Sequence, residues 1–163
     1  MIPFKAIRSA IVQGLSAYLS LPVIEMNGGG DMPTGPFLTY DFADFESARG
    51  FPIEYQEDNN LQQVGTVPFT VSFLSYADDK ATSITNAMKA QDWFKRDGRE
   101  LLKDQVNVIV AEIGINENRD VLIENEWERR QGFEVTFRTL DVTDGEFIAI
   151  EKAQVKGVFG LGG

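Results

Sequence analysis

The chain has 163 residues, of which 43% are hydrophobic and 11% aromatic, and its formal net charge is −10. Length and composition predict one globular domain with a packed core. The sequence contains neither cysteine nor histidine, which excludes disulfides, thiolate zinc sites and Ser-His-Asp or Cys-His catalytic arrangements. The negative charge disfavours a broad basic surface that grips a phosphate backbone, and solubility is the simplest explanation for it.

A first amphipathic helix is predicted from about Pro3 to Leu19. Its apolar residues recur at spacings of three and four: Phe4, Ile7, Ile11, Leu15 and Tyr18. Lys5 and Arg8 precede an apolar stretch, as in a signal peptide, but polar residues interrupt that stretch. Because no run approaches the roughly 18 apolar residues of a membrane span, a soluble protein is expected.

The segment after this helix combines short strands with long connections. Leu21–Ile24 is predicted to be extended, and the glycine-rich stretch Asn27–Pro36 is predicted to be a loop. Its three consecutive glycines lack the Gly-Lys-Ser/Thr of a phosphate-binding loop. Phe37–Phe42 reads as a strand, and Asp44–Gly65 as either a long excursion or a hairpin. Loops of that length often bind something, so contacts with a neighbouring subunit are predicted there.

Thr66–Tyr76 alternates apolar and polar residues with the period of a half-buried strand. Asp78 or Asp79 can cap a following helix, which is predicted to end near Asp97-Gly98. The residues at helical spacing in this helix are Ala81, Ile84, Met88, Gln91, Phe94 and Lys95, with Trp93 beside them.

Strand patterns return in the C-terminal half, after a short helical stretch at Arg99–Asp104. The predicted strands and turn are Val106–Val110, a turn at Gly114–Arg119, Val121–Ile123 and Phe133–Arg138. Asp144-Gly145 is a typical hairpin turn, so Phe147–Val155 is predicted to pair antiparallel with the preceding strand.

Helices and strands cluster along the chain rather than alternate. This order predicts an α+β fold, a mostly antiparallel (mixed) sheet with two main helices packed on one face. Residues 1–157 are predicted to form the single domain, and residues 158–163 a flexible C-terminal tail.

Carboxylates are plentiful enough to permit paired-acid catalysis. Glu124, Glu126 and Glu128 alternate in a strand-like segment and are predicted to lie on one side of it, as a solvated or subunit-facing edge. Asp141–Glu146 lacks the full spacing of a calcium loop. With no nucleophile next to a base, the sequence predicts a protein that is not an enzyme and binds no metal or cofactor.

The densest polar patch combines Asn116–Asp120 with Glu126–Arg130, where opposite charges surround a tryptophan. Arginine and tryptophan are enriched at protein interfaces. A cross-strand salt-bridge ladder within one subunit is an equally good interpretation. The candidate interface residues for a subunit or partner are Asn118, Arg119, Asp120, Glu126, Trp127, Glu128, Arg129 and Arg130.

Over residues 66 to 156 the chain resembles the phage neck or tail-terminator family. The passages that carry the resemblance are VPFTVSFLSYADDKATSITNAMKAQDWF, GRELLKDQVNVIVAEIG and INENRDVLIENEWERRQGFEVTFR. The family pattern has a Ser-Tyr near a strand end, a helix closing on Trp-Phe, an Asn-Arg-Asp turn and a Glu-Arg-Arg-x-Gly-Phe strand entry. Here Ser75-Tyr76, Trp93-Phe94, Asn118–Asp120 and Glu128–Phe133 match these motifs, whereas Asp44–Gly65 departs from the pattern.

The resemblance implies a structural virion protein that is made in the bacterial cytoplasm and resides in the tail or neck. Such a subunit forms a ring, usually of six, on the last tail-tube ring, stops tube growth and joins the head connector. The implied partners are other copies of the chain, the tail-tube protein and a connector or neck protein, with a sheath terminal ring as a further candidate. DNA would pass through the lumen without specific binding, and an acidic lumen would repel its phosphates.

Three alternatives remain open. The nearest is another ring-forming virion protein, for head completion or the tail tube. A carboxylate- or metal-dependent hydrolase would require several acidic groups converging in one buried cleft. A small regulatory binding protein would present one concave apolar groove.

Overall fold

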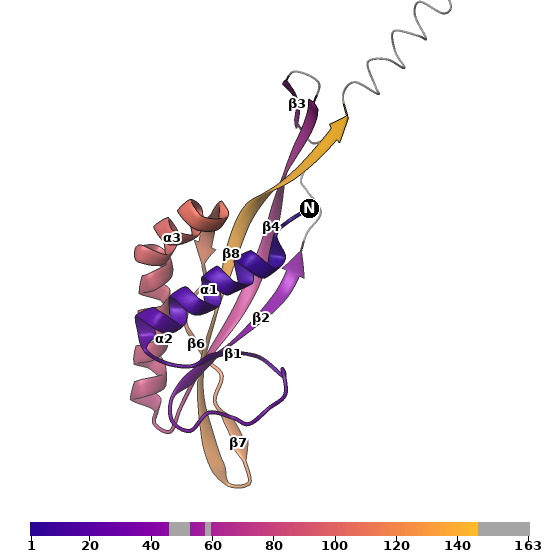
Figure 1. The fold of residues 1–163 in the computed structure, drawn as a ribbon. Helices are drawn as coiled ribbons and strands as arrows, with labels where there is room; N and C mark the ends of the chain where they lie inside the picture. The colour runs from indigo at the N-terminus through magenta and orange to yellow at the C-terminus, as the bar shows by residue number, and fades with distance from the viewer. Residues whose placement is uncertain (46–52, 58–59, 147–163) are drawn as a thin grey trace, which may run out of the picture.

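The computed structural model of the chain describes residues 1–45, 53–57 and 60–146 (Figure 1). In this part of the chain three helices accompany one mixed sheet, which confirms the predicted α+β fold. The helices are α1 (Phe4–Leu19), α2 (Lys80–Lys95) and α3 (Asp97–Val106). The strands are β1 (Val23–Glu25), β2 (Phe37–Phe45), β3 (Ile53–Glu57), β4 (Asn60–Ala77), β5 (Val108–Ile113), β6 (Glu117–Asn118), β7 (Val121–Ile123) and β8 (Glu126–Glu146).

The sheet is organised around two long strands. Its order is β1-β2-β4-β8-β5, with β3 paired to β4 and with β6 and β7 paired to β8. Only the β1–β2 pair of the described strands is parallel. β4 and β8 stay in register from Asn60–Glu146 to Ala77–Arg129. Figure 1 shows that this ladder extends past the helices at both ends, with β3 at the upper end and β7 at the lower end.

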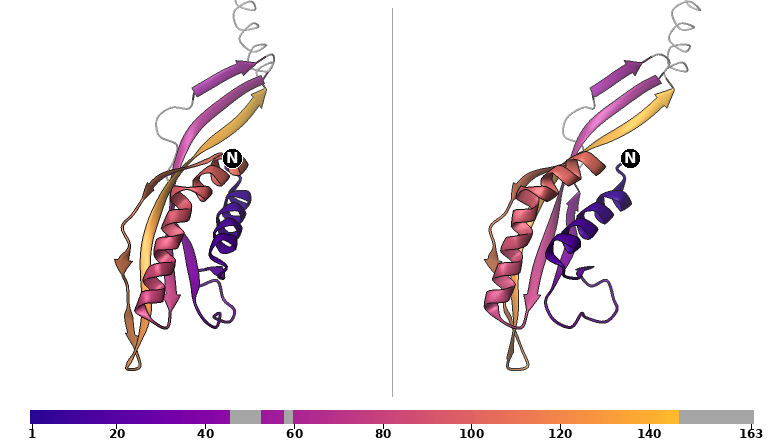
Figure 2. Two further views of the ribbon diagram at one scale, coloured as in Figure 1. Left: turned by 90° about the vertical axis from the view of Figure 1, so that its left-hand side faces the viewer. Right: turned by 60° about the vertical axis from the view of Figure 1, so that its left-hand side comes forward.

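The core lies between one face of this sheet and the helices, which cover the middle of the ladder (Figure 2). Alternate residues of β4 and β8 supply paired phenylalanines. The ring centroids of Phe69 and Phe137 are 5.1 Å apart, and those of Phe73 and Phe133 are 5.3 Å apart. From α1, the predicted helix face contributes Ile7, Ile11 and Leu15 to this core.

Helix α2 begins as predicted but buries a different face. Asp79 is its N-cap, because the Asp79 carboxylate accepts a hydrogen bond from the Thr82 backbone N–H at 2.9 Å. The predicted stripe through Ala81 and Met88 is wrong, since both residues are exposed. The buried residues are Ser83, Ala87, Ala90, Trp93 and Phe94. Small side chains on this face let the helix approach a sheet surface already filled by phenylalanine rings.

Two predictions for the long strands are settled by pairing. Asp144-Gly145 forms no hairpin turn, because β8 continues through both residues, opposite Gln62 and Leu61 of β4. Long-range pairing outweighs the local turn preference of these residues. Within Asp44–Gly65 the hairpin alternative is confirmed, since β3 pairs antiparallel with β4.

Other predictions concern segment ends. The strand predicted from Val106 begins at Val108, because Asn107 has a φ of 54° and ends α3 in the left-handed conformation. The predicted pairing of Phe147–Val155 and the tail at 158–163 lie outside the described residues. In the described part of the chain, no helix is long and apolar enough to cross a membrane.

Candidate interaction surface at the hairpin end

A tight hairpin forms the lower end of the β8 ladder. β7 pairs with the start of β8, with Leu122 opposite Trp127 and Ile123 opposite Glu126. The two connecting residues, Glu124 and Asn125, have φ values of 49° and 66°. Two consecutive positive φ angles are typical of a type I′ turn, whose twist matches that of the flanking strands.

This hairpin exposes a group of large apolar side chains. Leu122 and Trp127 are each 54% exposed, and Val121 and Ile123 are also exposed. The hairpin extends beyond the helices (Figure 1), so no helix of the described chain covers these side chains. Leu122 and Trp127 share one face of the hairpin, and Val121 and Ile123 lie on the other. Exposed apolar side chains grouped on one element are typical of sites that bind another protein. We call these four residues the hairpin tip.

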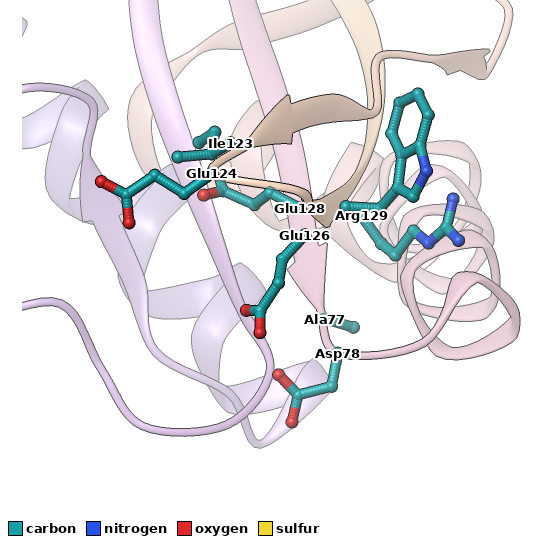
Figure 3. Close-up of a pocket in the computed structure, with 8 residues that line it drawn as sticks. Ala77, Asp78, Ile123, Glu124, Glu126, Glu128 and Arg129 are labelled. Carbon is teal, nitrogen blue, oxygen red and sulfur yellow. The ribbon is translucent and has the colours of Figure 1, made fainter.

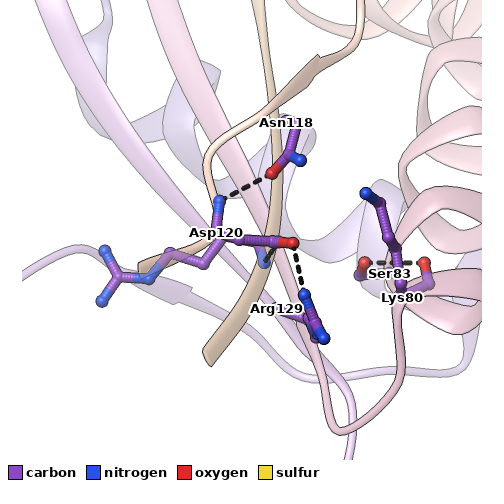
Figure 4. A network of polar contacts seen from close by, with 6 residues as sticks. Lys80, Ser83, Asn118, Asp120 and Arg129 are labelled. Atoms are coloured by element: carbon purple, nitrogen blue, oxygen red, sulfur yellow. Dashed lines mark hydrogen bonds and ion pairs between the residues drawn. The ribbon is translucent and has the colours of Figure 1, made fainter. Parts of the chain in front are cut away.

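Directly above the hairpin tip, Asp120 links β7 to β8 (Figure 4). Its Oδ1 accepts a hydrogen bond from the Arg130 backbone N–H at 2.8 Å, and its Oδ2 accepts from Arg129 Nη1 at 3.0 Å. The Asp120 N–H donates to Asn118 Oδ1 at 2.8 Å. The Asp120 side chain is 6% exposed, so these contacts satisfy a carboxylate that is almost removed from water.

The environment of Asp120 lowers its pKa below the ordinary value. Burial opposes this by disfavouring the charged carboxylate. The hydrogen bonds from Arg130 and Arg129, with the positive charges of Arg129 and Lys80, outweigh burial and lower the pKa. Asp120 is therefore held as an anion that ties the hairpin to the sheet.

The remaining arginines of the patch lie on the face of the sheet opposite the helices. Arg130 donates to Glu128 from Nε at 2.7 Å, and its guanidinium lies 5.1 Å from the ring centroid of Tyr76. The Tyr76 ring is stacked on Phe37 with centroids 4.6 Å apart. The motif residue Tyr76 is thus the middle layer of a Phe37–Tyr76–Arg130 stack.

Arg119 crosses the same face over Gly132. A Cβ on Gly132 would lie 2.6 Å from Arg119 Cδ, so the glycine of the strand-entry motif leaves room for this side chain. Arg119 also forms an ion pair with Glu117 at 3.6 Å. Packing against Arg119 therefore explains why this position of the Glu-Arg-Arg-x-Gly-Phe motif is a glycine.

The structure therefore brings the eight predicted residues together, and most of their charges are paired within the subunit. Of the predicted cross-strand ladder the structure has one ion pair, Asp120–Arg129, whereas Glu128 and Arg130 pair within β8 itself. Arg129 also lies 5.5 Å from the ring centroid of Trp127. Within the described chain, Glu126 has no ion pair.

Beside the tip lies an open hollow of about 730 Å³ (Figure 3). Its lining residues are Ala77, Asp78, Ile123, Glu124, Glu126, Trp127, Glu128 and Arg129. Glu124 occupies the turn, so the prediction that it shares a strand face with Glu126 and Glu128 is wrong. Among the described residues, no group of acidic side chains is arranged to hold a metal ion.

Sequence reasoning missed the hairpin turn and the aromatic stack. Asn125 tolerates a positive φ and was the one local cue for the turn, whereas Glu124 gives none. The Phe37–Tyr76 contact joins residues far apart in sequence, and it follows only from the register of β2 against β4.

The family model described as phage neck terminator protein matches residues 4–162. One solved structure similar to this chain is the "Virion of native gene transfer agent (GTA) particle". A chain of that structure is 12% identical with a TM-score of 0.39, and the match covers 86% of this chain and 96% of that chain. A search of curated proteins gave no match. The family match over nearly the whole length shows that the chain belongs to the phage neck terminator proteins, structural components of the virion neck.

Proposed function

We propose that this neck protein assembles as a ring of six copies on the last ring of the tail tube, ends tube growth and forms the joint to the head connector. The observation that carries the proposal is the uncovered hairpin tip. Its exposed tryptophan and leucine are held on a rigid hairpin by the Asp120 contacts. A surface of this kind serves binding to another protein rather than chemistry.

The charge of the chain suits this role. A ring around DNA must let phosphates pass, and a net charge of −10 repels them over distances of about a Debye length, ~8 Å at physiological salt. The protein would therefore surround DNA without binding it. Its specific partners would be further copies of the chain, the tail-tube protein and a connector protein.

The direct test is electron microscopy of lysates from a phage or prophage that lacks this reading frame. The proposal predicts tails of uncontrolled length and separate, DNA-filled heads. Plasmid-borne wild-type protein should restore joined particles of normal tail length.

The same images separate the rival virion roles. Loss of all tails would indicate a tube protein, and tails of normal length beside heads that have lost their DNA would indicate head completion. Normal joined particles from the deletion would contradict every neck function.

A further inference from the structure

At the upper end of the β4–β8 ladder, the exposed apolar side chains lie on the face of the sheet opposite the helices. In the body, Phe69 of β4 and Phe137 of β8 point toward the helices. From the paired residues Thr66 and Leu140 upward, the valines of β4 and β8 instead occupy the alternate positions that point away from the helices. Val64 and Val142 are directly opposite each other and therefore lie on the face that the helices leave uncovered.

Strand β3 extends this apolar surface. Ile53 pairs with Val64, and Tyr55 pairs with Gln62 on the same face. Ile53 is 60% and Tyr55 53% exposed, and Leu140 and Val142 are exposed as well. We call these residues, with Val64, the arm face: Ile53, Tyr55, Val64, Leu140 and Val142.

The opposite side of the arm is mostly polar, with Leu61 as an apolar exception. There Gln63 Nε2 donates to Glu54 Oε1 at 3.2 Å, and the amino group of Met1 forms an ion pair with Asp141 at 2.9 Å. A sheet that extends past its own helices with one largely apolar face leaves that face available to bind another molecule.

At the base of the arm face is a hollow of about 230 Å³ that Arg138 helps to line. Its lining residues are Thr66, Asn107, Ile109, Arg138, Thr139 and Leu140. Ile109 and Arg138 pair across β5 and β8, and so lie on the same face as Leu140. Both are exposed, and Arg138 has no ion pair in the described residues.

The hairpin tip at the other end of the molecule has complementary features. It is apolar, and beside it Glu124, Glu126 and Asp78 have no ion pair within the described chain. Figure 3 shows these three carboxylates extending to the same side of the hollow. Counting only contacts among the described residues, one end of the chain thus offers an apolar surface with carboxylates that form no ion pair, and the other an apolar surface with a guanidinium that forms none.

We propose that the hairpin tip of one copy docks on the arm face of a second copy, with Trp127 and Leu122 against Ile109, Leu140 and Val142. Glu124, in the turn at the end of the hairpin, then pairs with Arg138. The contact joins unlike surfaces, so it is heterologous and repeats around a ring when the rotation between copies closes. The inference rests on the proposed ring function and assigns the surfaces that build it.

Engineered cysteines test this contact without interference, because the chain has no cysteine. Leu122→Cys labels the hairpin tip and Val142→Cys the arm face. Within one chain these positions cannot bridge, since Trp127 opposite Leu122 is fifteen residues before Val142 on β8, roughly 50 Å along a strand. Any disulfide between them joins two copies.

The double variant is expressed in the phage, and purified particles are oxidised and run on a non-reducing gel. Most of the chain should migrate as a ladder of covalent oligomers. Each single variant, and a control pairing Leu122→Cys with Met88→Cys on exposed α2, should remain monomeric. Dimers of Val142→Cys alone would indicate a symmetric arm-to-arm contact and overturn the proposal. Intact particles without cross-links would overturn it while leaving the neck function in place.

A charge exchange tests the polar part of the contact. Arg138→Glu should lower the yield of joined particles at least tenfold, and adding Glu124→Arg should restore most of it. If the combined variant is no better than Arg138→Glu, Arg138 does not face this carboxylate.

Discussion

The Trp93 ring packs closely against glycines of α1 and α3. A Cβ on Gly98 would lie 2.4 Å from Trp93 Cδ2, and one on Gly14 2.6 Å from Trp93 Cζ2. Trp93 is buried, so its ring cannot move away into solvent. The Trp-Phe motif therefore depends on two glycines contributed by other helices.

Gly98→Ala is expected to lower the free energy of unfolding by about 1–3 kcal/mol, because a methyl group overpacks this contact. Urea denaturation measures the change. The control is Arg99→Ala, an exposed neighbour in the same helical turn, which should stay within about 0.5 kcal/mol of wild type. A Gly98→Ala protein as stable as the control would show that the ring relaxes.

Asp120→Asn is expected to destabilise the protein by about 1–3 kcal/mol at neutral pH, because the ionic contact with Arg129 is lost. The lowered pKa means that this contribution is complete above the unfolded-state pKa of about 3.9. It disappears as the pH falls through the lower folded-state pKa. The stability difference between wild type and variant, measured from pH 7 to pH 3, should therefore shrink only below about pH 4. A constant difference would mean that the Asp120 charge is not involved.

Among the elements, the β7–β8 hairpin contains a locally unfavourable residue. Glu124 has a φ of 49°, a conformation that costs a residue with a side chain roughly 1 kcal/mol. Glu124→Gly removes this cost, and amide hydrogen exchange should slow in β7. Glu124→Val is the opposing variant, because a β-branched side chain resists positive φ and should speed exchange there. Equal exchange in the two variants would contradict the turn geometry.

Elements with a clear apolar period were predictable from sequence, and elements that depend on distant partners were not. The face of α1 and the centre of β4 followed from spacings of 3.6 and 2 residues. The hairpin turn predicted at Asp144-Gly145 does not form, because these residues pair with Gln62 and Leu61, about eighty residues earlier in the chain. The buried face of α2 was misplaced because small residues, rather than Ile84 and Met88, pack against the phenylalanine rings.

The candidate site was predictable as a set of residues but not as an arrangement. The opposite charges of Asn116–Asp120 and Glu126–Arg130 marked both segments as one polar patch. Only the hairpin register shows that Asp120 pairs with Arg129 and that Trp127 and Leu122 remain exposed. Asp120, Glu128, Arg129 and Arg130 pair within the subunit, and we propose that the exposed residues of the same patch bind a partner.

For the whole molecule, folding and assembly should be separable. Trp127→Ala removes an exposed ring, so the thermal stability of the isolated protein should change by no more than about 0.5–1 kcal/mol. In the deletion strain, however, the variant should fail to restore tails of normal length. Met88→Ala, which shortens an exposed apolar side chain on α2, is the matched control and should restore them. Full restoration by Trp127→Ala would show that the hairpin tip is not part of the assembly surface.

The central claim, a ring of this chain at the head-proximal end of the tail tube, is tested most directly by cryo-electron microscopy of the neck in intact particles. The predicted result is a single closed ring of six copies between the last tube ring and the connector, with the three-helix α+β fold resolved in each copy. Density for the chain repeated along the tube, or absent from the neck, would contradict the account.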